Sequence, residues 1–381
     1  MRLSVAESLE QVRPEDWDRV AGGHDPFLSH AFLYALERSG CACDASGWSA
    51  RHLLLHASDG HLAAAVPLYL KSHSFGEFVF DWAWADAYRR AGLRYYPKLV
   101  ATVPFTPVTG TRMLVAAGED RDAIRRQLIG AARDLADRLG ASSLHWLFTT
   151  ADDTAALETH GMMRRTGYQF HWHNRGYRDF DDFLAGFSSQ KRKKIRRERL
   201  QVREAGVETV LLTGDDLTSA HWERFYGFHL ATLRKHDAAP YLTPEFFQTL
   251  GETLREHVVM VVARRGQDDV AAALNLRGAD ALYGRYWGGA QDIPGLHFET
   301  CYYRAIEYCI AAGIPRFEGG AQGGHKLARG FLPNMTFSAH WLRHPEFERA
   351  VADFLERERN GLEAHLDELN EHSPFKKDEG T

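Results

Sequence analysis

The first half of the chain alternates between helical and extended hydrophobic patterns, which predicts an α/β fold. The expected elements are helices at 14–22, 29–39 and 119–139, a hairpin from 52–55 and 62–70, an aromatic strand at 75–84 and a buried strand at 142–148. Phe32 and Leu36 lie four residues apart, and Ser29 is a suitable N-cap for their helix. Gly60 lies in the hairpin turn, and Gly140 closes the third helix.

The second half repeats this order of elements. The expected elements are strands at 257–263, 270–276 and 281–287, a helix at 297–312 closed by Gly313, and a short strand at 314–317. The step from helix to short strand reads RDLADRLGASSLHWLF in the first half and AIEYCIAAGIPRFEGG in the second. Solenoid repeats run roughly 20–50 residues, so a longer repeat of this kind indicates a duplicated domain.

Three parts of the chain are therefore expected. Residues 1–178 form the first α/β domain, and residues 179–345 form the second, which a basic helix opens. Residues 346–381 form a C-terminal amphipathic helix with a frayed tail, because Pro345 suits a first helical position and apolar residues follow at helical spacing.

Composition predicts a soluble globular protein, since 44% of the 381 residues are hydrophobic and 25% are charged. No apolar run approaches the roughly 18 residues that a membrane span needs. The N-terminal residues include acidic side chains and Pro14 where a signal peptide needs an apolar stretch. We therefore expect a cytoplasmic protein without a membrane span.

Charge and cysteine content narrow the choice of partners. The 46 basic and 51 acidic residues give a net charge of -5, which excludes a protein coated with cations but permits a local basic patch. The cysteines form no C-x-x-C pair, and the 20 histidines show no H-E-x-x-H spacing. We expect no disulfide framework and no metal site.

The strongest local signal is the basic run at 191–199, in which seven of nine residues are Lys or Arg. On a helix such a run is costly through self-repulsion unless anions offset it. One interpretation is a site for a phosphorylated or RNA-like ligand. The other is a solvated helix that pairs with acidic residues elsewhere. The candidate ligand-binding residues are Lys191, Lys193, Arg196 and Arg197.

A second signal is the glycine-rich segment 317–331. Glycines such as Gly320 and Gly323 let the backbone approach a ligand closely. The same segment holds an acid, an imidazole and two cations. We expect a functional site with Glu318 and His325 as acid/base residues, while Lys326 and Arg329 hold a phosphate or carboxylate.

A third signal is the aromatic segment 80–88, which interleaves Asp81 with Trp82 and Trp84. Flat apolar side chains with a few polar groups suit the wall of a cleft. An aromatic core beneath a loop explains the same pattern equally well. In the first interpretation Asp81 orients a bound amine, and the site lies where residues 318–330 meet residues 80–88 at the junction of the two domains.

A shorter pattern, Arg285-Tyr286-Trp287-Gly288-Gly289-Ala290, fits the R-x-x-G-x-A sequence with which N-acetyltransferases hold the pyrophosphate of coenzyme A. Arg285 and Tyr286, however, fall inside an expected strand, and Pro294 precedes the next helix. The pattern alone therefore does not identify coenzyme A as a ligand.

Longer stretches resemble a known family. YGRYWGGAQDIPGLHFETCYYRAIEYCIAAGIPRFEGG resembles the closing half of a GNAT domain in the Fem-type peptidyltransferases, and FSSQKRKKIRRERLQVREAGVE resembles the basic helix that opens their second domain. PLYLKSHSFGEFVFDWAWADAY, YYPKL, VPFTPVTG, HWLF and GAQGGHKLARGF are together similar to the bacterial FemAB-like group of tandem GNAT proteins. These motifs span residues 24–345.

The resemblance implies two tandem GNAT-like domains (acyl-CoA N-acyltransferase-like). The Fem relatives pass an amino acid from aminoacyl-tRNA to the amine of a cell-wall precursor. We therefore expect an acyl- or aminoacyl-transferase with an amine acceptor, with tRNA held at the basic helix. Aminoacyl-tRNA or acyl-CoA serves as donor co-substrate, and no cofactor is tightly bound.

Two alternatives stay open: an acyl-CoA-dependent N-acyltransferase, and a non-catalytic protein that binds an anionic, precursor-like ligand. The loop expected in the group has a proline and a glutamate where this chain has Gly319 and Gly324. Loss of a glutamate beside His325 removes a proton-accepting group, which favours the non-catalytic alternative.

Overall fold

The computed structural model describes residues 1–320 and 323–376. The chain forms two compact units: unit 1 comprises Met1–Gly167 and Met335–Ala364, and unit 2 comprises Tyr168–Asn334 together with the chain from His365 onward. The chain passes from one unit to the other within three continuous elements, namely β9 (Met163–His173), β15 (Leu332–Leu342) and α12 (Pro345–Glu371).

This division differs from the boundaries at 178/179 and 345/346 expected from the sequence. Residues 168–178 belong to unit 2, and residues 335–364 belong to unit 1. The reason is that β15 pairs with a strand of unit 1, while Val351 and Leu355 of α12 pack with Trp84 of the same unit. The tail expected to be frayed lies, from residue 377 on, outside the described residues.

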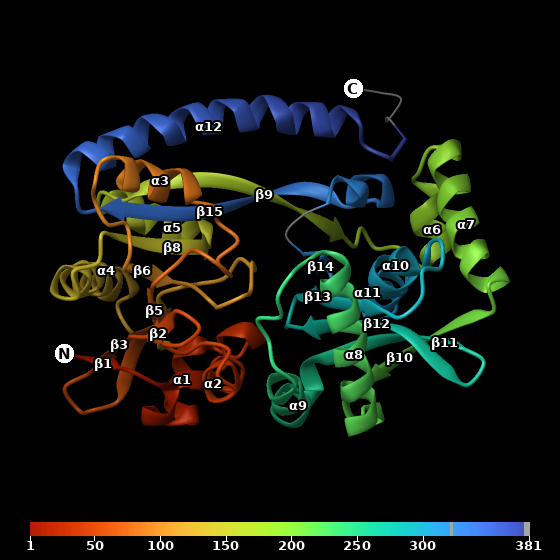
Figure 1. The fold of residues 1–381 in the computed structure, drawn as a ribbon, viewed down its shortest axis with the longest axis horizontal. Coiled ribbons are helices and arrows are strands. Elements are labelled where there is room, and N and C mark those ends of the chain that lie inside the picture. The colour runs from red at the N-terminus through yellow and green to blue at the C-terminus, as the bar shows by residue number, and fades with distance from the viewer. Residues whose placement is uncertain (321–322, 377–381) are drawn as a thin grey trace. The chain divides into compact units, whose positions relative to one another are not determined.

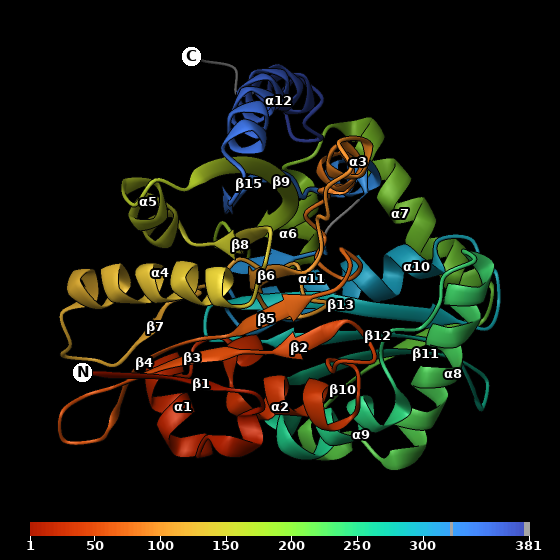
Figure 2. The same cartoon turned by 60° about the vertical axis from the view of Figure 1, so that its left-hand side comes forward.

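Unit 1 contains two sheets. Its helices are α1 (Pro14–Ala21), α2 (His30–Arg38), α3 (Trp82–Arg90), α4 (Arg121–Arg138) and α5 (Ala151–Thr159). Its strands, besides β9 and β15, are β1 (Arg2–Ala6), β2 (Trp48–Ala50), β3 (His52–His56), β4 (Leu62–Val66), β5 (Leu68–Lys71), β6 (Lys98–Ala101), β7 (Leu114–Val115) and β8 (Ser143–Thr149). One sheet has the order β1-β3-β4-β7, with α1 and α4 on its opposite faces (Figure 2). The other contains β15-β8-β6-β5-β2.

The hairpin is confirmed for β3 and β4, but its second arm, expected at 62–70, ends at Val66, and Leu68–Lys71 is a separate strand in the other sheet. Ser29 caps α2 by accepting a hydrogen bond from the Phe32 N–H at 3.2 Å. The strand expected at 75–84 is wrong, because this segment is a loop followed by α3. Gly76 and Phe78 adopt φ angles of 82° and 60°, which no extended strand allows. Glu77 and Asp81 turn inward instead, and both are buried.

The strands of unit 2 lie in the order β10-β11-β12-β13-β14-β9. Its strands are β10 (Val207–Thr213), β11 (Val258–Arg265), β12 (Asp268–Arg277), β13 (Ala281–Gly289) and β14 (Arg316–Glu318). Its helices are α6 (Phe180–Ala185), α7 (Ser189–Glu204), α8 (Ser219–Lys235), α9 (Pro244–Thr253), α10 (Leu296–Phe298) and α11 (Arg304–Ala311). A π-helical turn, Glu299–Tyr303, joins α10 to α11, and α8 lies against β12 and β13 (Figure 1).

The repeated order of elements is confirmed at its most informative step. In unit 1, β6 and β8 are parallel, and α4 lies between them in the chain. In unit 2, β13 and β14 are parallel, and the helical segment 296–311 connects them. Parallel neighbours require such a crossover, which explains why helix, glycine and short strand recur together in the sequence.

Close packing of α8 on β13 explains Gly288, near the end of this strand. A Cβ atom on Gly288 would lie 2.1 Å from the carbonyl carbon of Phe228 and 2.3 Å from the His229 nitrogen. Both atoms belong to the α8 backbone, which cannot move aside as a flexible side chain can. Only glycine therefore fits at this point of the strand.

Replacement of Gly288 by alanine should lower the free energy of unfolding by about 1–3 kcal/mol, because the helix must shift to admit the methyl group. Urea unfolding measures the change. Gly227→Ala in α8 is the matched control, since an added Cβ there meets nothing within 4 Å and should raise stability by up to about 1 kcal/mol. Equal stability of both variants would contradict the packing argument.

Candidate functional site

The pairing of two parallel strands in unit 2 stops where one of them ends and the other continues, and we call this point their divergence. The pairing of β13 with β14 runs from Ala281–Arg316 to Tyr283–Glu318 and ends there, whereas β13 continues to Gly289. Beyond this point β13 bulges against β12, where Leu274 faces Tyr286 and Asn275 faces Gly284. Arg285 is the extra residue of the bulge. Bulges re-aim side chains and are common beside active sites.

A cavity of about 140 Å³ lies at this divergence. Its lining includes Arg285 and Tyr286 of β13, Gly319 and Gly320 after β14, and His297 of α10. Asn275, Cys301 and Tyr302 complete its polar wall. Two separate sequence signals, the Arg285 pattern and the glycine-rich segment, thus meet in one cavity.

A π-helical turn gives the opposite wall of the cavity its shape. Cys301 and Tyr302 lie within this turn and line the cavity, and such turns occur frequently at functional sites. Glu299 in the same turn is buried, and Arg199 of α7 donates two hydrogen bonds to its carboxylate at 3.0 and 2.8 Å. The basic helix therefore anchors the wall of the cavity.

Two histidines and a cysteine near the cavity are held in their neutral forms. Burial lowers the pKa of His297 to about 4 and also lowers the pKa of His325. The His325 Nε2 and the Tyr302 hydroxyl share a hydrogen bond of 3.0 Å, and the two imidazole rings lie 6.0 Å apart. Burial raises the pKa of Cys301 to about 12. At neutral pH the site holds two uncharged imidazoles and a thiol.

Two glycines of the glycine-rich loop adopt backbone angles in the left-handed region. Gly320 and Gly323 have φ angles of 85° and 118°, which favour glycine, while residues 321–322 lie outside the described residues. Lys326 is buried and donates a hydrogen bond to the Gly320 carbonyl at 2.8 Å. Burial lowers the pKa of Lys326 to about 8. Lys326 thus holds the loop in place.

Two charged residues of this loop have protein partners. Glu318 is buried, and its carboxylate accepts a hydrogen bond from the Arg316 Nε at 3.0 Å. Arg329 is buried, donates to Glu198 of α7 at 2.8 Å, and lies 3.2 Å from the ring centre of Phe298. The expected contact of Arg329 with a phosphate needs a free guanidinium, whereas these contacts tie the loop to α7.

The Arg285–Ala290 pattern lies in β13, as expected for its first residues. The Gly289 N–H donates to the Thr232 hydroxyl at 3.3 Å, and the Ala290 N–H donates to the Val270 carbonyl at 2.9 Å. A pyrophosphate would need these N–H groups. Their donation to the protein disfavours a coenzyme A pyrophosphate at this pattern.

The basic run forms α7, and the buried apolar residues of this helix are Ile195 and Val202. Leu200 is 45% exposed, because it lies on the outer face of the helix. The candidate residues Lys193, Arg196 and Arg197 are exposed, and Lys191 is half-buried. Arg196 donates to Asp181 at 2.9 Å.

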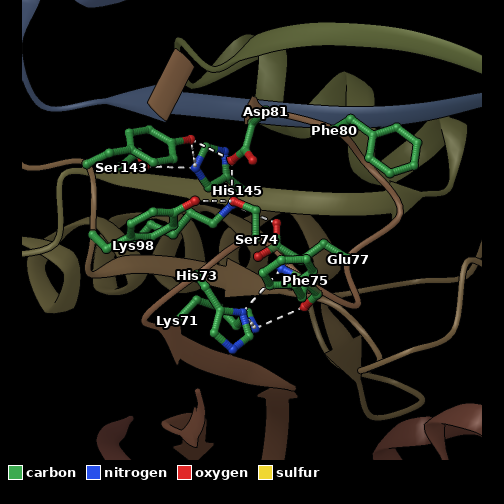
Figure 3. A network of polar contacts seen from close by, with 12 residues as sticks. Lys71, His73, Ser74, Phe75, Glu77, Phe80, Asp81, Lys98, Ser143 and His145 are labelled. Atoms are coloured by element: carbon green, nitrogen blue, oxygen red, sulfur yellow. Dashed lines mark hydrogen bonds and ion pairs between the residues drawn. The ribbon is translucent and has the colours of Figure 1, made fainter. Parts of the chain in front are cut away.

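Asp81 belongs to a buried polar network in unit 1 (Figure 3). The Lys98 ammonium, which is fully buried, donates to Asp81, to Glu77 at 2.7 Å and to the Ser74 hydroxyl at 2.8 Å. The Tyr95 hydroxyl donates to Asp81 at 2.6 Å. Asp81 thus has strong partners within its own unit, and its meeting with the glycine-rich loop of unit 2 stays a prediction.

The two carboxyl groups of this network differ in their pKa values. Burial would raise the pKa of Asp81, but Lys98 outweighs burial and lowers it to about 2. Burial raises the pKa of Glu77 to about 7, because Lys98 alone does not compensate the charges of both Asp81 and Glu77. Burial lowers the pKa of Lys71 to about 7, and its ammonium lies 3.6 Å from the ring centre of Trp48.

The two tryptophans of the aromatic segment have different environments. Trp84 is buried, and its ring meets the His340 ring edge-on at 5.0 Å. Trp82 is 42% exposed and contacts the exposed ring of Phe75 at 5.0 Å. The core interpretation therefore holds for Trp84, while Trp82 is available at the surface.

A histidine pair in unit 1 escaped sequence reasoning. His145 of β8 faces His340 of β15 in register, and their Nδ1 atoms share a hydrogen bond of 2.7 Å. Each Nε2 is bonded to the hydroxyl of the serine two residues earlier, Ser143 or Ser338. The sequence does contain a Ser-x-His triplet in each of these two strands. The triplets indicate a histidine pair only when the pairing of the two strands is known.

Comparisons with known proteins agree with this architecture. The model of the FemAB-like family, described as peptidoglycan biosynthesis/recognition, matches residues 8–377. The crystal structure of FemX is similar with a TM-score of 0.55 at 10% identity, over 92% of this chain and all of that chain. The C-terminal domain of a putative lysylphosphatidylglycerol synthetase from Agrobacterium fabrum has a TM-score of 0.53 at 12% identity, over 89% and 94% of the two chains.

L-PGS from Bacillus licheniformis gives a TM-score of 0.52 at 11% identity, over 87% of this chain and 98% of that one. No curated protein sequence matches. The expected fold of two tandem GNAT-like domains is confirmed. Among the described residues there is no group of three or more His, Cys, Asp or Glu that could hold a metal ion, and no helix is long and apolar enough to cross a membrane.

The histidine pair predicts acid sensitivity. Burial lowers the pKa of His145 to about 3 and that of His340 well below its usual value, so both stay neutral in the folded protein. Their contribution to stability is fully present above about pH 6.5 and is lost as the pH falls below it, because only the unfolded chain gains the protons.

Replacing His340 by glutamine should therefore reduce the slope of the free energy of unfolding against pH, between about pH 6.5 and 5, by up to about 1.4 kcal/mol per pH unit. Urea unfolding at several pH values measures this slope. His236→Gln, at an exposed position, should leave it unchanged. An unaltered slope in the His340 variant would show that this imidazole takes up its proton in the folded state.

Proposed function

The chain belongs to the FemAB-like family, and on this premise we propose that it transfers a small acyl or aminoacyl group from an activated donor to an amine. Its fold is that of the peptidoglycan-related transferases of this family. The identity of the reaction rests on the geometry of the cavity in unit 2.

The observation that carries the proposal is the divergence of β13 from β14. Backbone N–H groups of a strand that has left its neighbour can polarise the donor carbonyl and stabilise the oxyanion that forms on it. The cavity lies at this divergence and is lined by Gly284 and Arg285 of the same strand. GNAT-type acyl transfer needs such an oxyanion site and no covalent nucleophile.

The proposed chemistry is direct aminolysis. The lone pair of the acceptor nitrogen forms a bond to the donor carbonyl carbon, and the C–O bond of an ester or the C–S bond of a thioester breaks. The proton lost by the nitrogen passes to an imidazole, and the departing oxygen or sulfur takes up a proton. His325 suits this role because it is neutral near pH 7 and lies at the site. His297 is neutral as well, but the burial that lowers its pKa to about 4 makes it the weaker proton acceptor.

The size and charge of the cavity restrict the acyl group. A cavity of about 150 Å³ holds a benzene molecule, so the 140 Å³ found here admits a group of about six non-hydrogen atoms. No carboxylate occurs among the described residues that line it. A lysyl side chain would be too long and would lack a counter-charge, whereas a small neutral acyl or aminoacyl group fits.

For the donor we favour aminoacyl-tRNA, with its phosphates on the exposed face of α7 at Lys193, Arg196 and Arg197. Acyl-CoA is the alternative donor, and the N–H groups of Gly289 and Ala290 argue against a pyrophosphate at that end of β13. The acceptor is a small-molecule amine. A non-catalytic binding protein is the alternative function that Gly319 and Gly324 favour.

The deciding experiment incubates the purified full-length protein with aminoacyl-tRNA or acyl-CoA and a panel of amines, and follows donor loss and amide formation by mass spectrometry. Transfer of alanyl or acetyl groups, with lysyl groups transferred at least tenfold more slowly, is the expected result. Binding of an acceptor without consumption of any donor would support the non-catalytic alternative.

Replacing His297 or His325 by glutamine should lower kcat by about a hundredfold or more, because the proton of the attacking amine loses its acceptor. Steady-state kinetics measure kcat, and the thermal unfolding midpoint checks folding. His236→Gln is the control. If both variants stay active while Glu318→Gln abolishes turnover at unchanged stability, Glu318 is the proton acceptor.

Reversing three charges on α7, in the variant K193E/R196E/R197E, should weaken tRNA binding at least tenfold and flatten its salt dependence. Folding should be unaffected, since exposed charges contribute little to stability. The control R121E/R126E/R138E makes an equal change in net charge on α4. Filter binding at several salt concentrations measures both, and equal affinity of the two variants would remove α7 from the donor site.

A further inference from the structure

Unit 2 has a second cavity, which shares no lining residue with the cavity of the transfer site, and its role would go beyond the proposed function. It is an open groove of about 890 Å³ between α6, α7 and α11. Its charged rim carries four guanidinium groups and three carboxylates: Arg178, Arg196, Arg199, Arg203, Asp179, Asp181 and Glu307. This volume lies within the roughly 300–1,000 Å³ that ligand sites occupy.

The four guanidinium groups differ in their availability. Arg199 is bound to Glu299 and Glu307, and Arg196 to Asp181. Arg178 pairs with Asp182, although its side chain is 81% exposed. Arg203 is exposed and forms no ion pair with another described residue. Arg203 is therefore the rim residue best able to bind an anion, and Arg178 is the second.

The floor of the groove is aliphatic. Leu184 of α6, Leu200 of α7 and Ile310 of α11 line it together with Ala311. Leu200 is 45% exposed in a helix that is otherwise strongly basic, which leaves apolar surface in contact with water. An alkyl chain laid on these residues would remove that surface from water.

The same geometry argues against a nucleobase. Phe180 is the aromatic side chain among the described residues that line the groove, and the Arg199 guanidinium lies 4.6 Å from its ring centre. The guanidinium covers that face of the ring, so a nucleobase cannot stack on it. An anion joined to an aliphatic chain matches the arginine rim and the aliphatic floor at once.

We propose that this groove binds an anionic phospholipid at a membrane surface. The lipid phosphate lies against Arg203 and Arg178, and the upper methylenes of an acyl chain lie on Leu200 and Ile310. The exposed Lys193 and Lys194 on the same helix add long-range attraction to an anionic surface. The groove holds one head group and a short length of chain, and the protein stays peripheral to the bilayer.

Co-sedimentation of the full-length protein with vesicles tests the proposal. Vesicles of phosphatidylcholine containing phosphatidylglycerol should bind it, and vesicles of phosphatidylcholine alone should bind it at least tenfold more weakly. The variant R178Q/R203Q should bind the anionic vesicles about tenfold more weakly. Leu200→Asn should also weaken binding severalfold, whereas the matched control Leu200→Met should bind like the unaltered protein.

R121Q/R126Q on α4 controls for the loss of two positive charges, and circular dichroism checks folding of each variant. Equal binding of L200N and L200M, with displacement by millimolar inorganic phosphate, would overturn the proposal in favour of a simple phosphate site. Equal binding of these two variants with displacement by single-stranded RNA would overturn it in favour of a nucleic-acid site. Vesicle binding needs no donor or acceptor, so this result and that of the transfer assay are independent.

Discussion

Two adjacent residues of α7, Glu198 and Arg199, hold together the site in unit 2. Glu198 accepts hydrogen bonds from Arg329 of the glycine-rich loop and from Tyr303 of the π-helical turn, and Arg199 binds Glu299 of that turn. A buried ion pair is not a strong source of net stability, but removal of one partner leaves an uncompensated charge and is costly. The loop and the turn are thereby held to one helix, and the cavity walls have one arrangement.

This constraint gives the basic helix two roles on two faces. Its inward face carries Ile195 and Val202 together with the charged pair that anchors the cavity walls. Its outward face carries exposed cations; Lys193 and Arg197 form no ion pair with another described residue, whereas Arg196 pairs with Asp181. A ligand bound to the outer face is thus one helix diameter from the residues that position the cavity walls. This arrangement suits a large donor, because its reactive group can be oriented in the cavity while the rest of the donor stays outside.

In unit 1 a loop is also held by buried charged residues, but here one cation binds two carboxylates. Lys98 is a single buried cation that gathers Asp81, Glu77 and Ser74 from one loop, and this network shapes a segment whose glycine and left-handed residues exclude a strand. Gly319 and Gly320 give the loop of unit 2 its freedom, whereas Lys326 and Arg329 restrain it. In both units a buried cation fixes a loop that local hydrogen bonding would leave loose.

The sequence by itself determined the elements whose signals are local: the hairpin, the capped helices, the duplicated helix-to-strand step and the basic helix. Periodicity, caps and turn residues act over a few positions, so they can be read without the fold. It also marked Arg285, Tyr286 and Gly320, which meet in one cavity.

Tertiary structure alone decided what these residues do. His297, Cys301, Tyr302 and Lys98 carry no local signal, because their roles arise from burial and from partners far along the chain. Arg329 was expected to bind a ligand and instead binds Glu198, since a charged side chain's partner is set by packing rather than by its neighbours in sequence.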